Sequence, residues 1–187
     1  MRVIAGEFRS RVLKSLPGSE LRPTPDRLRE SLFSIVAPRL RDAIFLDAYA
    51  GSGAVGIEAL SRGAARAIFI EKHRPAVALI RENVEALGLL ERSLIVLGTV
   101  TREIARFPAG IVFLDPPYPL ENEYADALQI LGRNPPPLAI AQHSRRFDLA
   151  GHYGKLKRTR TLRQGDNCLS FFSSEELQLD GSAGPAT

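Results

Sequence analysis

The sequence predicts an α/β protein in which a mostly parallel sheet carries helices on both faces. Short apolar runs alternate with amphipathic stretches through the middle of the chain. The runs are almost continuously apolar, which is typical of strands that are buried on both faces of a sheet. Each stretch between two runs can hold one crossover helix, and parallel neighbours require such a crossover. Together these observations indicate βαβ units.

Five apolar runs account for the parallel strands. They are residues 43–47, 67–71, 94–97, 111–115 and 138–142. The connecting helices are expected over residues 55–62, 75–87, 101–106 and 123–131. Gly63 and Gly88 end the first two of these helices. Pro75 suits the first turn of the second, because a helix does not use the N–H at that position.

The two ends of the chain depart from this alternation. Residues 2–14, with Gly6 in a turn, are expected to form a short β-hairpin. The apolar spacing after Asp26 predicts an amphipathic helix that stops before Pro38. Near the other end, residues 156–162 and 168–172 alternate like strands around a turn, which predicts an antiparallel hairpin and brings the sheet to seven strands.

We expect one compact domain with three parts. An N-terminal hairpin and helix extension covers residues 1–41, and the core covers residues 42–174. Residues 175–187 end in a stretch of small residues and are expected to be a disordered tail.

The composition bounds the classes of protein that need to be considered. The chain has 187 residues, of which 44% are hydrophobic and 25% charged, as in soluble globular proteins. No apolar run approaches the roughly 20 residues of a membrane helix, and no secretory signal opens the chain. A single cysteine, Cys168, excludes intrachain disulfides and cysteine-built metal sites. We therefore expect a cytoplasmic monomer without a metal ion or a membrane partner.

The charge is separated along the chain. The net charge is +4, yet residues 1–41 carry nine basic and four acidic residues, and residues 145–163 carry seven basic residues and one acid. The remaining residues are therefore acidic on balance. Basic ends around an acidic middle favour a polyanion such as nucleic acid as the partner, the alternative being a basic face that binds nothing.

A glycine turn follows the first predicted strand. The segment reads Asp-Ala-Tyr-Ala-Gly-Ser-Gly from Asp47 to Gly53, and Glu71 ends the second strand. Glycines let the backbone approach a ligand closely, and an acid about 20 residues on can bind ribose hydroxyls. A nicotinamide dinucleotide uses similar glycines. Asp47 at the mouth of the loop disfavours an anionic pyrophosphate and favours a cationic methionine group.

The tetrapeptide Asp-Pro-Pro-Tyr, residues 115–118, follows the fourth strand. The two prolines stiffen the backbone and lack N–H donors, so carbonyl oxygens remain as acceptors. An acid and a fixed carbonyl can hold the two hydrogens of a planar amino group while the tyrosine ring stacks on the base. The alternative is a rigid turn without a ligand.

These two motifs, with Arg-Pro-Thr-Pro-Asp-Arg at 22–27 and the segment 56–64, give the chain a family resemblance. It resembles the bacterial 16S ribosomal RNA guanine-N2 methyltransferases from residue 2 to about residue 172. The resemblance implies a Rossmann-like class I methyltransferase fold and S-adenosyl-L-methionine as the cofactor. It also implies that 16S rRNA, in the small ribosomal subunit or an assembly intermediate, is the partner.

The resemblance also implies roles for individual residues. The catalytic group would be Asp115, Pro116, Pro117 and Tyr118. The cofactor would be bound by Asp47, Tyr49, Ala50, Gly51, Ser52, Gly53, Glu71, Lys72, Gly98 and Thr99. The RNA would be contacted by Arg9, Arg11, Arg22, Thr24, Arg27, Lys157, Arg158 and Arg160.

The chain departs from the family pattern at three places. Thr99 follows Gly98 where the family often has an aspartate near the adenine. Gln142-His143-Ser144 stands where Glu-His-Ser is common, and Gln164 begins a segment where the family has Tyr-Gly-Asp. With no acid or cysteine near it in sequence, we expect His143 to be structural.

Other functions remain as alternatives. A DNA adenine-N6 or cytosine-N4 methyltransferase uses the same tetrapeptide, but the chain has no room for a separate target-recognition domain. A non-catalytic nucleotide-binding module or a nicotinamide oxidoreductase leaves that tetrapeptide without a role. A base C5 methyltransferase needs a cysteine nucleophile, and Cys168, which no proline precedes, sits in an apolar strand pattern.

Overall fold

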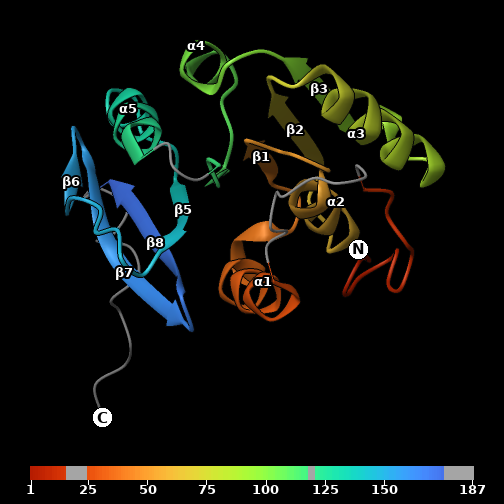
Figure 1. Ribbon diagram of the computed structural model, residues 1–187, viewed down its shortest axis with the longest axis horizontal. Helices are drawn as coiled ribbons and strands as arrows, with labels where there is room; N and C mark the ends of the chain where they lie inside the picture. Colours follow the sequence, from red (N-terminus) through yellow and green to blue (C-terminus); the bar gives the residue numbers. More distant parts are fainter. Residues whose placement is uncertain (16–24, 118–120, 175–187) are drawn as a thin grey trace.

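The computed structural model describes residues 1–15, 25–117 and 121–174, and one sheet runs through this part of the chain (Figure 1). Its strands are β1 Ile44–Ala48, β2 Arg66–Glu71, β3 Ser93–Leu97, β4 Ile111–Leu114, β5 Leu138–Ser144, β6 His152–Tyr153, β7 Leu156–Gln164 and β8 Asn167–Ser174. They lie in the order β3-β2-β1-β4-β5-β8-β7-β6. Strands β1 to β5 pair in parallel, and β8, β7 and β6 add antiparallel neighbours.

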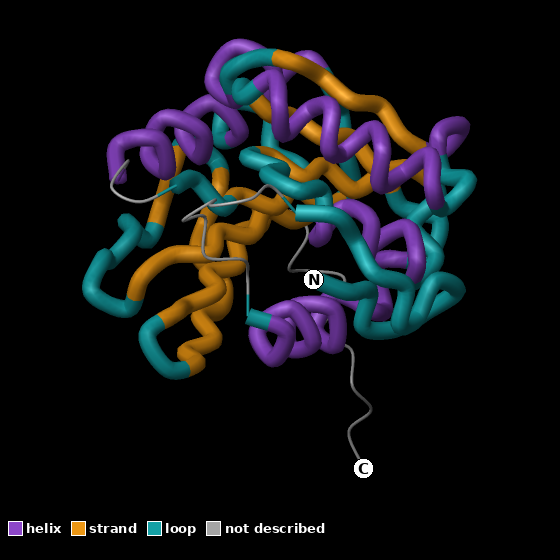
Figure 2. The backbone as a smooth tube through the Cα atoms, turned by 45° about the vertical axis from the view of Figure 1, so that its right-hand side comes forward, coloured by secondary structure: helices purple, strands orange, loops and turns teal. Residues whose placement is uncertain are grey.

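Helices cover both faces of this sheet (Figure 2). They are α1 Asp26–Leu40, α2 Ala54–Ser61, α3 Arg74–Ala86, α4 Val100–Glu103 and α5 Glu121–Leu131, with 3₁₀ turns η1 Leu90–Arg92 and η2 Ile104–Arg106. On one face, α1 and α2 pack on alternate residues of the central strands, such as Phe45 and Phe113, while α3 packs on Phe69 of β2. On the other face, α4, η2 and α5 pack on the residues between them, such as Leu46 and Leu114. No helix within the described ranges combines the length and apolarity that spanning a bilayer requires.

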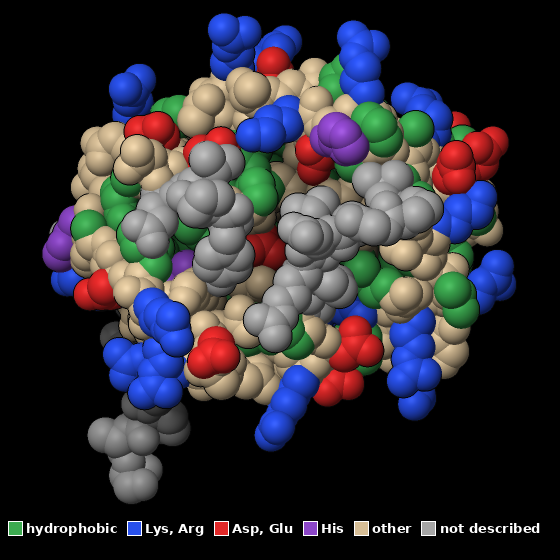
Figure 3. Space-filling model, viewed as in Figure 1, with side chains coloured by type: hydrophobic (Ala, Val, Ile, Leu, Met, Phe, Trp, Pro, Cys, Tyr) green, Lys and Arg blue, Asp and Glu red, His purple; other side chains and the backbone are tan. Residues whose placement is uncertain are grey.

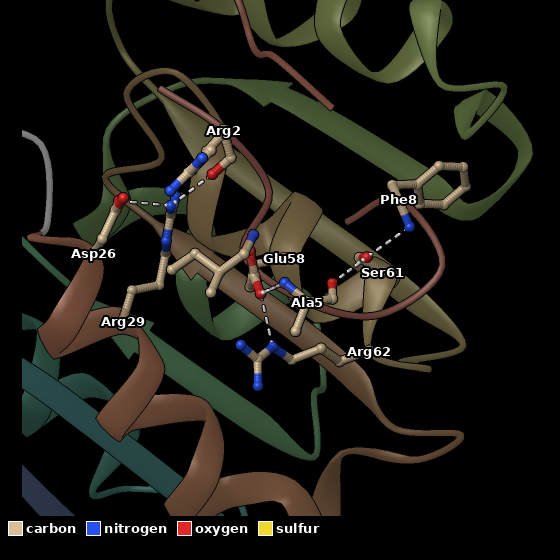
Figure 4. Close-up of polar contacts among 9 residues, drawn as sticks. Arg2, Ala5, Phe8, Asp26, Arg29, Glu58, Ser61 and Arg62 are labelled. Carbon is tan, nitrogen blue, oxygen red and sulfur yellow. Dashed lines mark hydrogen bonds and ion pairs between the residues drawn. The ribbon is translucent and has the colours of Figure 1, made fainter. Parts of the chain in front are cut away.

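The N-terminal segment, residues 1–14, lies against α2 (Figure 4). The buried carboxylate of Glu58 accepts the N–H groups of Ile4 and Ala5 at 2.8 and 3.0 Å. The hydroxyl of Ser61 donates to the carbonyl of Ala5 at 2.6 Å and accepts the N–H of Phe8 at 3.0 Å. Side chains of α2 thus take the place of a second strand for this segment.

Asn83 of α3 fixes the other end of this segment. Its amide oxygen accepts the N–H of Lys14 at 2.9 Å, and its amide nitrogen donates to the carbonyl oxygens of Lys14 and Ser52, both at 3.2 Å. Asn83 is buried. One side chain therefore joins the N-terminal segment to the glycine turn.

Three differences from the sequence prediction have local causes. The segment 2–14 forms one antiparallel bridge, between Arg2 and Val12, without regular strands, because several of its N–H groups bond to α2. Helix α1 does not stop before Pro38 but runs on to Leu40. Pro38 lies in the last turn, where its missing N–H removes one bond at the frayed end of the helix. An eighth strand, β6, has two residues, too few for an alternating pattern.

Candidate active site at the carboxyl edge of the sheet

Asp47 lies inside the site, next to the start of α2. Its side chain is buried, and its Oδ2 accepts the N–H of Gly56 at 2.8 Å. Burial raises the pKa of the Asp47 carboxyl well above its usual range, and the charges of Asp115 and Glu71 raise it further, while the Gly56 N–H acts in the opposite direction. A cation nearby would relieve this electrostatic cost.

The glycine turn links Asp47 to α2. Tyr49 has a φ of 65° and Gly53, directly before α2, a φ of 79°, so both adopt the left-handed conformation, which glycine tolerates best. The N–H of Gly53 donates to the carbonyl of Ala50 at 2.7 Å, and the N–H of Ala50 to that of Ile70 at 3.0 Å. The predicted cofactor loop is therefore a tight turn fastened to β2.

Glu71 braces the same loop. Its Oε2 accepts the N–H of Gly51 at 2.9 Å, and its Oε1 accepts the N–H of His73 at 2.8 Å. The acid thus stands beside the glycine turn at the end of β2, where the sequence predicts it. Each carboxylate oxygen has a further lone pair, so Glu71 can also accept from a ribose hydroxyl.

Two further predicted cofactor residues, Tyr49 and Lys72, lie close to Glu123 of helix α5. The ammonium group of Lys72 lies 3.5 Å from the carboxylate of Glu123. Burial, together with neighbouring Glu123, raises the pKa of the Tyr49 hydroxyl. Glu123 is a site residue that the sequence reasoning missed, because only the folded chain brings α5 to the glycine turn.

Gly98 and Thr99 lie at the start of α4. Gly98 donates its N–H to the carbonyl of Glu71 at 3.0 Å, and the exposed Thr99 precedes the first turn of α4. The side chain of Glu103 lies against Gly98: a Cβ at Gly98 would come within 3.3 Å of its Oε1. The structure therefore places an acid beside Gly98, from a position four residues beyond Thr99 that the sequence analysis did not single out.

The tetrapeptide of the second motif follows β4. Asp115 and Pro117 are half-buried and Pro116 is buried, whereas Tyr118 lies outside the described residues. Because β1 pairs with both β2 and β4, Asp47, Glu71 and Asp115 stand at the same ends of three adjacent strands. Figure 3 shows an acidic side chain recessed near the middle of one face of the molecule, with Lys and Arg side chains around its rim.

Those predicted RNA residues that the structure describes do not form one cluster. Arg9, Arg11 and Arg27 are exposed on the N-terminal segment and α1. Arg160 is exposed on β7, and Arg158 pairs with Asp148 at 3.0 Å. Figures 1 and 2 place the N-terminal segment and β7 on opposite sides of α1.

Lys157, also of β7, is half-buried. Arg22 and Thr24 lie outside the described residues, as does the predicted tail 175–187.

His143 has a structural role. Its Nδ1 lies 2.9 and 2.8 Å from the carbonyl oxygens of Ser144 and Phe147, so Nδ1 carries the proton, and Nε2 accepts from the hydroxyl of Ser170 at 2.8 Å. Burial lowers the pKa of this imidazole. These bonds hold β5 to β8 and to the loop that follows β5.

The chemistry of the site fits a cationic ligand with a ribose. Three acids converge on it, one of them buried with a raised pKa. Within the described ranges, no group of three histidine, cysteine or acidic side chains is placed to hold a metal ion.

Comparisons with known proteins agree with this arrangement. The sequence model of a family described as "Conserved hypothetical protein 95" matches residues 1–173. The chain is 34% identical over 170 residues to "Putative rRNA methyltransferase YlbH" of Bacillus subtilis, covering 86% of this chain and 91% of that one. It is 42% identical over 120 residues to "Ribosomal RNA small subunit methyltransferase D" of Escherichia coli K12, covering 63% and 60%. The solved structure "Putative methyltransferase yhhF from Escherichia coli" superposes with a TM-score of 0.81 at 28% identity, covering 94% and 98%.

Proposed function

The chain belongs to the family described as conserved hypothetical protein 95, and we propose that it methylates N2 of a guanine in 16S ribosomal RNA, with S-adenosylmethionine as the methyl donor. Its fold is that of class I methyltransferases. The observation that carries the proposal is the convergence of Asp47, Glu71 and Asp115, with Asp115 followed by two prolines. An acid that is followed by carbonyl oxygens on a rigid backbone can accept the two hydrogens of an amino group.

Asp47, Glu71 and the glycine turn would hold the methyl donor. S-adenosylmethionine would supply an electrophilic methyl group on a cationic sulfur. The carboxylate of Asp47, whose charge burial disfavours, gains from a cationic neighbour. Glu71 keeps lone pairs for the ribose hydroxyls, and Lys72 and Gly98 would border the adenine.

Asp115 and the carbonyl oxygen of Pro116 would hold the target amino group. The lone pair of guanine N2 is delocalised into the ring, so the nitrogen is a poor nucleophile. Two acceptors on its hydrogens draw it towards tetrahedral geometry and localise the lone pair, which forms the new N–C bond as the S–C bond breaks. The nitrogen then releases one proton towards the carboxylate of Asp115. Alignment of this kind can contribute about 7–11 kcal/mol to lowering the barrier.

The exposed arginines of the N-terminal segment and α1 would contact the RNA backbone. Arg9, Arg11 and Arg27 are exposed to solvent, so their charges are available to phosphate groups. A guanine must leave its stack to reach Asp115, so the substrate is an unpaired or flipped nucleotide in a loop or on an open ribosomal surface.

The proposal is tested by incubating the protein with isotopically labelled S-adenosylmethionine and small ribosomal subunits that lack base methylation. We expect label on one guanine of 16S rRNA, at N2, located by digestion and mass spectrometry. Protein-free 16S rRNA and a DNA duplex are run in parallel. Label on adenine N6 or cytosine N4, or on DNA alone, would refute the assignment to guanine N2.

A further inference from the structure

Gln142 is the lateral neighbour of Asp115 in the sheet. Strands β4 and β5 pair in parallel with Leu114 opposite Ala141, so the next residues on the two strands are Asp115 and Gln142. Residues two positions earlier, Phe113 and Ile140, pack in the same core cluster under α1. Because side chains alternate along a strand, Gln142 and Asp115 share that face of the sheet, at its carboxyl edge.

The amide oxygen of Gln142 is buried, and none of the described residues donates a hydrogen bond to it. The hydroxyl of Tyr124 donates to the main-chain carbonyl of Gln142 at 2.7 Å, and the ring of His143 is held on both of its nitrogens. The backbone at this position is therefore fixed. A buried acceptor without a donor is costly, so one on the strand next to Asp115 points to a donor that arrives with a ligand.

Guanine, adenine and cytosine differ in whether the ring nitrogen beside their amino group donates or accepts a hydrogen bond. In guanine the 2-amino group is flanked on its Watson–Crick side by N1–H, a donor, and on its other side by N3, an acceptor. In adenine and cytosine the amino group is flanked by an unprotonated ring nitrogen, an acceptor. With the amino group held by Asp115 and Pro116, a base turned with its Watson–Crick edge towards the next strand, β5, would present this ring position to Gln142. An acceptor there matches guanine alone.

We propose that the side-chain oxygen of Gln142 accepts the N1–H of the target guanine and so selects guanine over other bases with an amino group. This inference rests on the proposed function, because it needs a guanine amino group at Asp115. It assigns a role to the position where this chain has glutamine in place of the glutamate common in the resembling family. Glutamine and glutamate both offer an oxygen acceptor, so the substitution keeps the recognition.

The test replaces the target guanine by 2-aminopurine, which keeps the 2-amino group but has no hydrogen on N1. Small subunits are reconstituted with 16S rRNA carrying either base at the mapped position. Transfer is measured for the wild-type protein, Gln142→Leu and Gln142→Glu. Gln164→Leu is the matched control, because Gln164 also has a buried oxygen without a donor among the described residues but lies on β7, two strands from β5.

We expect Gln142→Leu to lower kcat/KM for guanine by about 10- to 100-fold, as for a lost buried hydrogen bond, with little change for 2-aminopurine. Gln142→Glu should retain transfer to guanine and stay poor on 2-aminopurine, because the carboxylate accepts the N1–H of guanine but meets only another acceptor at N1 of 2-aminopurine. Gln164→Leu should leave the ratio of the two substrates unchanged. An equal loss on both bases in Gln142→Leu would mean a structural role and overturn the inference. If the wild-type protein modifies no guanine, the proposed function itself fails.

Discussion

Oδ2 of Asp47 accepts the N–H of Gly56 at 2.8 Å, which ties the end of β1 to the first turn of α2. This bond keeps a carboxyl group in the interior even though burial and the charges of Asp115 and Glu71 raise its pKa. The acid therefore destabilises the fold when it is ionised, and the cationic cofactor proposed for this site would offset that cost.

Asp47→Asn should make the protein more stable at neutral pH and a weaker binder of the cofactor. The usual carboxyl pKa is 3.8, so between this value and the raised pKa the folded chain holds a proton that the unfolded chain has released. Wild-type stability therefore falls as pH rises through that interval. Asparagine keeps an oxygen for Gly56 and removes the titration. Urea unfolding from pH 4 to pH 8 should show the stability difference growing with pH.

The same variant should bind S-adenosylhomocysteine about 10-fold or more weakly, because the ammonium group at the amino-acid end of this ligand would lose a hydrogen bond to a charged acceptor. Calorimetry at pH 7.5 measures this. A variant that is less stable than wild type at neutral pH, or that binds equally well, would contradict the role given to Asp47.

Asp115→Asn should separate chemistry from cofactor binding. The amide can still accept one hydrogen bond but cannot take the released proton or stabilise positive charge on nitrogen. We expect kcat to fall by at least about 100-fold, the scale seen when one preorganised group is removed from an active site. Binding of S-adenosylhomocysteine should stay within a few-fold of wild type. Methylation at the wild-type rate would remove Asp115 from the mechanism.

Replacing Arg9 and Arg11 by alanine should weaken RNA binding in a salt-dependent way. If both contact phosphates of an unpaired strand, the slope of log K against log salt should flatten by about 1.4, or 0.7 for each contact. The matched control replaces Arg39 and Arg41, two exposed arginines at the C-terminal end of α1. Equal slopes for the two double variants would place the RNA elsewhere.

Gly6→Ala should loosen the N-terminal segment. Gly6 has a φ of 84°, and a Cβ there would overlap the carbonyl group of Ser61. Strain of this kind costs about 1–3 kcal/mol, so the segment should lift from α2 and the amides of Ile4, Ala5 and Phe8 should exchange faster. Gly165→Ala is the control, because Gly165 has a similar φ of 59° with open space around it. Unchanged exchange in Gly6→Ala would contradict the packing described for α2.

The sequence was sufficient to predict the sheet and the family. The apolar runs identified β1 to β5 because strands buried on both faces must be apolar, and the two motifs led to the family that the comparisons confirm. The placement of the site acids at one edge followed from parallel pairing alone. Strand β6 could not be predicted because two residues are too few to show an alternating pattern. The continuation of α1 through Pro38 could not be predicted either, because proline usually ends a helix.

Contacts between distant segments could not be predicted. Glu58 and Ser61 lie in a stretch that reads as an ordinary helix, yet they hold the backbone of residues 4–8. Glu103 and Glu123 reach the site from helices whose packing the local sequence does not encode. These roles depend on the tertiary packing of helices and strands, whereas the patterns in a single sequence predict only the helices and strands themselves.

The bridge formed by Asn83 has a practical consequence for protein engineering. Grafting residues 1–14 from a relative, in order to redirect the enzyme to another RNA, would replace both the exposed arginines of this segment and the partner of Asn83. Since the same amide also holds the carbonyl of Ser52, a poorly matched graft would disturb the cofactor loop. A chimera should therefore be built with the graft and position 83 exchanged as one unit, because the N-terminal segment is not a detachable module.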